Sequence, residues 1–339
     1  MAGHVAVVGA TGAVGQEFLR VLEQRDFPFE RITFLASARS AGKPITFKGK
    51  EYKVTELTED SFGDIDLALF SAGGSISKKF APIAAEAGCV VVDNSSAFRM
   101  DPSAPLVVPE VNPDDAFQHE GIIANPNCST IIMVVPVWPL HKINPIQRIV
   151  CSTYQAASGA GYQAMVELEE QSRDVLAGKP VTPKVLPHQI AFNLFNHNSK
   201  VGENGYNEEE MKMVKETRKM FHQDDIQITA TCVRVPVMRA HCESLNLTFT
   251  KPMSEEQVRD VLSGAPGVRI VDDREKNYFP MPMESSDGDD VLVGRIRQDI
   301  SQPDGRGIDL FISGDQLRKG AALNAVQIAE LLEQGVPAS

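Results

Sequence analysis

The sequence predicts an α/β fold with two domains, and three observations support this prediction. With 339 residues, the chain is longer than one hydrophobic core usually supports. Its first third alternates short Val- and Ala-rich runs with helical stretches, which is typical of a parallel sheet buried on both faces. Its second half contains long strands of alternating polarity with few helices between them, which indicates a mixed or antiparallel sheet.

The composition is that of an ordinary globular protein, with 42% hydrophobic and 23% charged residues. The formal net charge of −12 argues against nucleic-acid or anionic-membrane partners, so an anionic ligand would need a local cluster of cations. The first strand begins by His4, which leaves no room for a signal peptide. The longest apolar stretch, around 131–140, is too short to span a bilayer. We therefore expect a cytoplasmic protein.

The five cysteines, at positions 89, 128, 151, 232 and 242, include no C-x-x-C pair. This pattern suits a reducing compartment and argues against a disulfide framework or a cysteine zinc site. His241 and Cys242 have no companion ligands at a suitable spacing. We predict no metal.

A glycine turn follows the first strand. The strand covers 4–8, a G-x-x-G-x-x-G loop covers 9–15, and a helix extends from Ala13 to about Arg25. Such a loop lets the backbone approach a pyrophosphate, which then lies at the helix N-terminus. A plain structural turn is the alternative, but the order strand, glycine loop and helix favours a Rossmann-type dinucleotide-binding domain. Its expected cofactor contacts are Gly9, Thr11, Gly12, Ala13 and Val14.

The second strand, 31–36, indicates which dinucleotide binds. An NAD-preferring domain would place a carboxylate near the end of this strand to hold the ribose 2′-hydroxyl, and none is present. Arg39 and Ser40 could instead bind a 2′-phosphate. A solvated surface turn is the alternative, yet both observations favour NADP.

Further strands at 66–70 and 89–93, with a helix at 76–87 between them, continue the α/β pattern. The polar loop 94–99 follows a strand, at the sheet edge where open α/β folds bind ligands. Arg99 in this loop is a candidate anion clamp, or else a surface arginine.

Cys128 begins a strongly apolar segment. Asn127 is a good N-cap, so Cys128 would be the first residue of a buried helix. The helix dipole at that position would favour the nucleophilic thiolate. Alternatively, Cys128 is a small core residue that happens to start a helix.

The second half supplies a histidine and an arginine that could assist this thiol. His241 begins a strand and Arg234 ends the one before it. A histidine can exchange protons near neutral pH, and an arginine can clamp a carboxylate. A structural histidine and a rim salt bridge are the alternatives. Predicted strands in this half are 147–155, 226–235, 241–251, 291–297 and 308–313. Predicted helices extend from the turn 158–161 to about 176, from 208 to about 221 and from 317 to 334.

The last helix should pack back on the first domain. We therefore predict a nucleotide-binding domain of residues 1–127 plus 315–339, and a catalytic and dimerisation domain of α+β type, 128–314. The broad second face of its sheet would need cover, which a partner subunit supplies most simply.

The sequence resembles the aspartate-semialdehyde dehydrogenases across nearly its whole length. Seven motifs in the family's order carry this resemblance: 9–15, 94–99, 125–130, 154–161, 209–212, 234–236 with His241, and 317–324. The sequence departs from the family's pattern at Cys242, where Ser is expected, and at 196–199. His197 in that loop is expected to be a surface histidine.

The resemblance implies NADP-dependent, reversible reductive dephosphorylation of 4-aspartyl phosphate to aspartate 4-semialdehyde, in the biosynthesis of lysine through diaminopimelate and of threonine, methionine and isoleucine. It implies a homodimer, with a tetramer as the alternative. The resemblance also implies roles for single residues. Cys128 forms an acyl thioester, His241 is the acid/base, and Gln155 positions the substrate, whose carboxylate and ammonium are held by Arg234 and Glu209. The implied phosphate ligands are Arg99, Asn127 and Lys212, and the residues implied to lie near the nicotinamide are Ser158, Gly159 and Gln316.

Other functions remain as alternatives. N-acetyl-γ-glutamyl-phosphate reductase shares the thioester chemistry, but its acetylated substrate would leave Glu209 unpaired. Glyceraldehyde-phosphate dehydrogenase differs in its nucleophile motif and in its NAD preference. A non-catalytic nucleotide-binding homologue would be expected to lack Cys128, His241 or Arg234.

Overall fold

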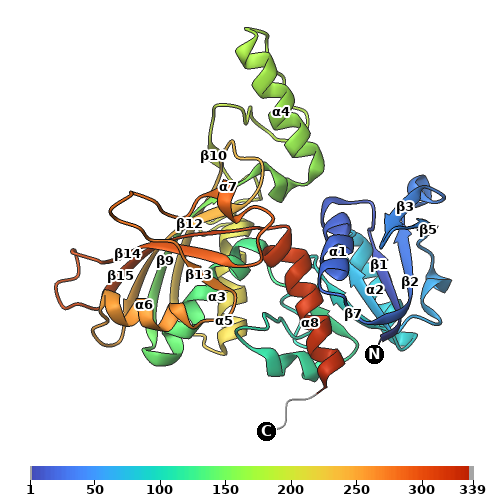
Figure 1. The fold of residues 1–339 in the computed structure, drawn as a ribbon, viewed down its shortest axis with the longest axis horizontal. Coiled ribbons are helices and arrows are strands. Elements are labelled where there is room, and N and C mark those ends of the chain that lie inside the picture. The colour runs from blue at the N-terminus through green and yellow to red at the C-terminus, as the bar shows by residue number, and fades with distance from the viewer. Residues whose placement is uncertain (1, 336–339) are drawn as a thin grey trace. The chain divides into compact units, whose positions relative to one another are not determined.

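The structure is a computed structural model that describes residues 2–335 (Figure 1). The chain divides into two compact units. The first unit contains the described residues up to Asn127 together with those from Ala321 onward, and the second extends from Cys128 to Gly320.

The first unit is built on a six-stranded sheet in the order β5-β2-β1-β6-β7-β8, in which all neighbouring strands are parallel. Residues 5–8 of β1 are completely buried, as expected for a strand covered on both faces. The strands are β1 (Ala2–Val8), β2 (Phe29–Ala36), β5 (Thr55–Glu56), β6 (Leu67–Phe70), β7 (Val90–Asp93) and β8 (Ile122–Ala124). A small hairpin, β3 (Pro44–Phe47) and β4 (Lys50–Lys53), lies outside this sheet.

Helices cover both faces of this sheet. Helices α1 (Ala13–Gln24) and α8 (Leu323–Gln334) share one core with Val5 and Val7 of β1. Helix α2 (Gly74–Glu86) shares the opposite core with Ala6 and Val8. Because successive side chains of β1 point to opposite faces, this strand packs against both helical layers, as in a Rossmann-type fold. The glycine loop follows β1 directly.

The second unit has a seven-stranded mixed sheet in the order β10-β11-β9-β12-β15-β14-β13. The pairs β11–β9 and β13–β14 are parallel and the other pairs are antiparallel. Of the two predicted alternatives, a mixed or an antiparallel sheet, the structure has the mixed one. The strands are β9 (Ile146–Gln155), β10 (Phe195–Asn196), β11 (Gln227–Arg234), β12 (His241–Phe249), β13 (Val268–Ile270), β14 (Val291–Gln298) and β15 (Gly307–Gly314).

Three helices pack on one face of this sheet: α3 (Cys128–Ile143), α5 (Glu208–Phe221) and α6 (Glu255–Ser263). The other face carries partly exposed side chains such as Tyr154, which is 41% exposed. Helix α4 (Tyr162–Leu176) extends away from the sheet of its own unit in Figure 1. A short helix, α7 (Pro282–Ser285), follows β13.

Three details differ from the sequence prediction. The sequence predicts no strand between 176 and 208, but this segment contains β10, which pairs with the end of β11. The predicted helix 317–334 opens as one wide π-helical turn over 318–322 before α8 begins. Residues 315–320, predicted for the first domain, lie in the second unit, because Asp315 and Gln316 form hydrogen bonds with residues of that unit.

Among the described residues, no helix is long and apolar enough to cross a membrane.

Candidate active site

Cys128 is the first residue of α3, as predicted, and Asn127 immediately precedes it. All five cysteines lie within the described residues, and Cys128 is the only one that is not buried. Burial raises the pKa of the Cys89 thiol to about 12 and that of Cys242 to about 11. It raises the pKa values of the other two thiols well above their ordinary range. Because the thiolate is the nucleophile, Cys128 is the candidate for covalent chemistry.

Three neighbouring strands bring Gln155, Arg234 and His241 together. Strand β9 ends at Gln155 and β11 ends at Arg234, and the parallel register pairs these two residues directly. Strand β12 begins at His241, and the next residue of β12 pairs with Tyr154 of β9. The side chains of Gln155, Arg234 and His241 are all buried. Strand pairing therefore unites residues that lie up to 86 positions apart.

The backbone of Ala156 holds both Arg234 and His241. Its N–H donates to Nδ1 of His241 at 3.0 Å, and its carbonyl accepts from Nη1 of Arg234 at 2.8 Å. Among the described residues, Nε of Arg234 and Nε2 of His241 are buried without a hydrogen-bond partner. Buried donors rarely stay unpaired, so both atoms mark a position that a polar ligand would occupy.

The protonation state of His241 follows from this environment. Burial, together with the positive charge of Arg234, lowers the pKa of His241 to about 3. The imidazole is therefore neutral at pH 7. Because Nδ1 accepts the Ala156 N–H, the single ring proton lies on Nε2. His241 thus presents an N–H donor to the site.

Gly159 lies directly against these two side chains. A Cβ atom at this position would lie 2.9 Å from Nη1 of Arg234 and 2.9 Å from both Cε1 and Nε2 of His241. Gly159 was predicted only as a nicotinamide contact. The structure shows in addition that a side chain at this position would have to displace the arginine or the histidine.

A second hydrogen-bond chain extends from the helix with the nucleophile to α5. Nε2 of Gln155 donates to Oγ of Ser129 at 3.0 Å and lies 3.5 Å from Oε1 of Glu209. Glu209 is buried, and its Oε2 accepts from Nζ of Lys212 at 2.9 Å. A capping box formed by Asn207 and the residue three positions later fixes the start of α5. Glu209 and Lys212 are therefore presented from a well-defined helix terminus.

His197, which was expected to be a surface histidine, is half-buried and belongs to this neighbourhood. Its backbone N–H donates to the carbonyl of Cys232 at 2.8 Å, which continues the pairing of β10 with β11. Its ring is half-buried, and Nδ1 accepts from the N–H of Ser199 at 3.2 Å. Desolvation lowers the pKa of His197 to about 4, and the charges of Glu209, Arg234 and Lys212 also act on it. Only the pairing of β10 revealed this location.

Gln316 and Ser158 were predicted to lie near the nicotinamide, and the structure places them in contact. Nε2 of Gln316 donates to Oγ of Ser158, and Oε1 of Gln316 accepts the N–H of Ala240 at 2.8 Å. Ala240 is the residue before His241. This contact joins the residues predicted for the cofactor to those predicted for catalysis within one unit.

The glycine loop of the first unit has the shape that a dinucleotide requires. Gly9 adopts φ +84°, and a Cβ there would lie 2.3 Å from the carbonyl oxygen of Ser71. A Cβ at Gly15 would lie 2.2 Å from the carbonyl oxygen of Gly9. Thr11 and Gly12 are exposed, and α1 begins at the next residue, Ala13. Close backbone packing thus leaves the N-terminus of α1 open to a phosphate.

Arg39, Ser40 and Arg99 also lie in the first unit. Arg39 is exposed after β2, whereas Ser40 is only 7% exposed, so Arg39 is the more accessible candidate for a 2′-phosphate. Arg99 is buried, and its guanidinium donates to the carbonyls of Asn125 at 2.9 Å and Asn94 at 3.0 Å. These carbonyls orient Arg99 without neutralising its charge.

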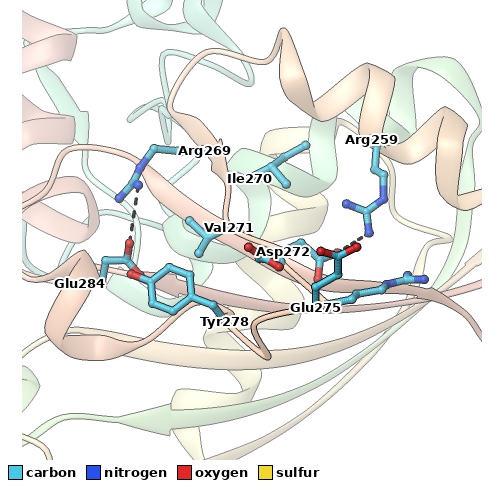
Figure 2. Close-up of a pocket in the computed structure, with 10 residues that line it drawn as sticks. Arg259, Arg269, Ile270, Val271, Asp272, Glu275, Tyr278 and Glu284 are labelled. Carbon is cyan, nitrogen blue, oxygen red and sulfur yellow. Dashed lines mark hydrogen bonds and ion pairs between the residues drawn. The ribbon is translucent and has the colours of Figure 1, made fainter.

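A hollow of about 750 Å³ lies elsewhere in the second unit, beside β13 (Figure 2). Its arginines face carboxylates: Arg259 pairs with Asp272, and Arg269 lies 3.7 Å from Glu284. None of the predicted site residues lines this hollow. We therefore do not assign the active site there. Among the described residues, no group of three or more His, Cys, Asp or Glu side chains could hold a metal ion.

Comparison with known proteins finds one family model in each of the two units. Residues 4–119 match the family model of the semialdehyde dehydrogenase NAD-binding domain, and residues 137–319 match that of the semialdehyde dehydrogenase dimerisation domain. An aspartate-semialdehyde dehydrogenase of Synechocystis is 58% identical over 97% of both chains. One from Aquifex aeolicus is 53% identical over 98% of both. The crystal structure of aspartate semialdehyde dehydrogenase II of Vibrio cholerae, complexed with ASA, shares 46% identity over 99% of both chains, with a TM-score of 0.95.

The two histidines with lowered pKa values make stability depend on pH. An unfolded histidine titrates near pH 6.5, whereas His197 and His241 in the folded protein titrate near 4 and 3. Between the pKa of the folded histidine and that of the unfolded one, the unfolded chain binds more protons than the folded protein. Acid therefore favours unfolding. We expect each histidine to lower the free energy of unfolding by ~1.4 kcal/mol per pH unit below about pH 6.

Urea unfolding at several pH values between about 6 and 4 would measure this slope. His241→Asn should show a smaller slope than the wild type, because it removes one of the two groups while leaving all carboxylates in place. Equal slopes in the two proteins would contradict the assignment of a neutral, buried His241.

Proposed function

Because this chain belongs to the aspartate-semialdehyde dehydrogenase family, we propose that it interconverts 4-aspartyl phosphate and aspartate 4-semialdehyde with NADP and phosphate through a thioester on Cys128. The observation that carries the proposal is the pair of unpartnered donors, Nε of Arg234 and Nε2 of His241, beside the strand end of Gln155. Biosynthesis of lysine through diaminopimelate, and of threonine, methionine and isoleucine, would use the reductive direction.

Arg234 would hold the α-carboxylate of the substrate. Its Nη1 is committed to the Ala156 carbonyl, while Nε has no partner among the described residues. A carboxylate would satisfy this buried donor with a charge-assisted hydrogen bond. Glu209 would take the substrate ammonium, since its carboxylate is buried and pairs with the partly exposed Lys212, which a substrate ammonium could replace.

Release of Lys212 from Glu209 would then make its ammonium available to phosphate. Asn127, next to the nucleophile, and Arg99, a buried cation oriented by backbone carbonyls, would complete the phosphate site. A cationic site of this kind would favour phosphate over water as the group that attacks the thioester. It would also explain how a chain of net charge −12 handles anionic ligands.

His241 would act mainly as a hydrogen-bond donor. The expectation that it takes the thiol proton does not fit the contact between the Ala156 N–H and Nδ1, because the ring proton then occupies Nε2. An Nε2–H donor would stabilise the oxyanion that forms when Cys128 attacks the aldehyde or the acyl phosphate. Gln155 would orient the substrate from the neighbouring strand.

The glycine loop 9–15 and Arg39 would hold NADP, and Ser158, Gly159 and Gln316 would contact its nicotinamide. The tight loop and the open N-terminus of α1 fit a pyrophosphate. When bound, the dinucleotide supplies the hydride chemistry. The family model for 4–119 supports a nicotinamide dinucleotide in general, and the exposed Arg39 supports NADP over NAD.

The protein would work as a cytoplasmic homodimer, with a tetramer as the alternative. The family model for residues 137–319 is that of a dimerisation domain. The uncovered sheet face bears Tyr154, and the region of α4 exposes Tyr162 (62%), Leu176 (78%) and Phe192 (64%). Exposed large apolar side chains such as these are typical of a surface that a subunit covers.

N-acetyl-γ-glutamyl-phosphate reductase activity is the second candidate. Its substrate has no ammonium, so the buried carboxylate of Glu209 would gain no partner from it. The family relationship also favours aspartate semialdehyde.

The decisive assay mixes the protein with aspartate semialdehyde, phosphate and NADP and follows NADPH. We expect turnover that requires phosphate and that disappears in Cys128→Ala, while NADP binding persists. N-acetylglutamate semialdehyde, assayed in parallel, should react poorly. Turnover of that compound alone, or equal turnover without phosphate, would exclude the proposed reaction.

Gly159→Ala should lower kcat/KM by about a hundredfold or more, because the added methyl group would displace Arg234 and His241 from the ligand position. Gly264→Ala is the matched control, since its φ is −103° and nothing lies within 4 Å of the added Cβ. The control should retain wild-type kinetics. A Gly159→Ala enzyme with normal kinetics would show that the site does not need this close approach.

Arg39→Ala should raise the KM for NADP at least tenfold, the cost of about one charge-assisted hydrogen bond, and should leave the KM for NAD nearly unchanged. Arg20→Ala, an exposed arginine on α1, serves as the control for loss of one surface charge. A similar rise for both dinucleotides would remove Arg39 from the 2′-phosphate site.

A further inference from the structure

Asp315 is a fully buried carboxylate in the turn that follows β15. Its Oδ1 accepts the N–H groups of Leu317 at 2.9 Å and Arg318 at 3.1 Å. Its Oδ2 accepts from Nε of Arg239 at 2.7 Å and from the N–H of Asp287 at 2.7 Å. One side chain therefore ties together three segments that are far apart in the sequence.

The segment containing Arg239 leads directly into the active site. Arg239 is followed by Ala240 and then by His241. Besides its bond to Asp315, the guanidinium of Arg239 lies 2.8 Å from Oδ1 of Asp287. The side chain of Arg239 is only 14% exposed and that of Asp315 is fully buried, so solvent screens the pair between Arg239 and Asp315 weakly.

Ala240 is held in a conformation that alanine rarely adopts. Its φ of +71° lies in the left-handed region, which costs a residue with a Cβ about 1 kcal/mol or more. The surrounding structure must therefore impose this conformation. Arg239 anchors it on one side, and on the other the Ala240 N–H donates to Oε1 of Gln316, the residue next to Asp315.

We propose that Asp315 is a positioning residue: by anchoring Arg239 and the turn that carries Gln316, it imposes the left-handed conformation of Ala240 and so sets the positions of His241 and of Gln316 with Ser158. The proposal deepens the function proposed above and rests on it. Asp315 itself touches neither Cys128 nor the groups that would hold the substrate, so its effect passes through the backbone.

The first test is Asp315→Asn, which preserves the shape of the side chain. The amide oxygen can still accept from the two backbone N–H groups of its own turn. The NH₂ group, which replaces Oδ2, is a donor and can accept neither from Arg239 nor from the N–H of Asp287. We expect kcat to fall about tenfold to a hundredfold through misplacement of His241. The KM for aspartate semialdehyde should change little, since Arg234 is anchored on Ala156 instead.

The second test is rescue by glycine. Gly adopts φ values near +70° without a Cβ penalty, so Ala240→Gly should restore much of the lost kcat when combined with Asp315→Asn. In the wild-type background Ala240→Gly should change kcat little, because the conformation is already imposed. A merely structural role of Asp315 would show no such specific rescue by one residue.

A readout without substrate keeps this proposal separate from the proposed function. Hydrogen exchange of the Ala240 amide, measured by mass spectrometry on a peptide that spans 238–242, should become at least tenfold faster in Asp315→Asn than in the wild type. If the wild type did not act on aspartate semialdehyde, the proposed function would fail while this exchange experiment still tested the anchor.

Asp304→Asn provides the matched control, because Asp304 also pairs with an arginine, Arg306, but on the surface. This control should keep wild-type kcat. Should Asp315→Asn fail to fold, Arg239→Gln removes the same contact from its outer side and should give the same kcat loss and the same rescue. Wild-type kcat in Asp315→Asn, no rescue by Ala240→Gly, or unchanged exchange at Ala240 would each overturn the proposal.

Discussion

The backbone N–H and carbonyl of Ala156 bind the two side chains on which the candidate site depends. A buried arginine and a buried histidine each need a hydrogen-bond partner, because an orphaned polar group costs about 1–3 kcal/mol. A carboxylate could serve both, but it would also neutralise the charge that an anionic substrate needs. The main chain satisfies one atom of each side chain without a counter-charge, and the opposite atoms remain available to a ligand.

The same arrangement separates the electrostatic properties of the two groups. Arg234 stays charged because a guanidinium keeps its proton even when burial lowers its pKa. Burial and, to a lesser degree, the charge of Arg234 keep His241 neutral, with a pKa of about 3. A charged group suited to a carboxylate thus lies beside a neutral donor suited to a developing oxyanion. The neutrality of His241 is not a property of histidine alone, since an exposed histidine would be partly protonated near pH 6.5.

The strand ends carry Gln155, Arg234 and His241, and the turns beside them fix how these side chains are placed. Gly159 lets the backbone lie close to Arg234 and His241, and Ala240 has a left-handed backbone conformation. Asp315 holds the turn that contains Gln316. Such features recur where a structure stores local strain for function. The glycine loop of the first unit follows the same principle, because a Cβ at Gly9 or Gly15 would collide with neighbouring carbonyl oxygens.

Local patterns in the sequence sufficed for the class of each domain, for the start of the helix at Cys128, and for the glycine loop, because periodicity, capping and glycine spacing act over a few residues. The resemblance to a family added the roles of residues scattered along the chain. What only the tertiary structure decided depends on pairing between distant segments. His197 was expected on a surface loop, and the pairing of β10 with β11 places it near Glu209 and Arg234. The bond from Ala156 determined which nitrogen of His241 carries the proton, and the contacts of Asp315 joined three separate segments behind it. No local propensity encodes these contacts, since each arises only when strands far apart in sequence come into register.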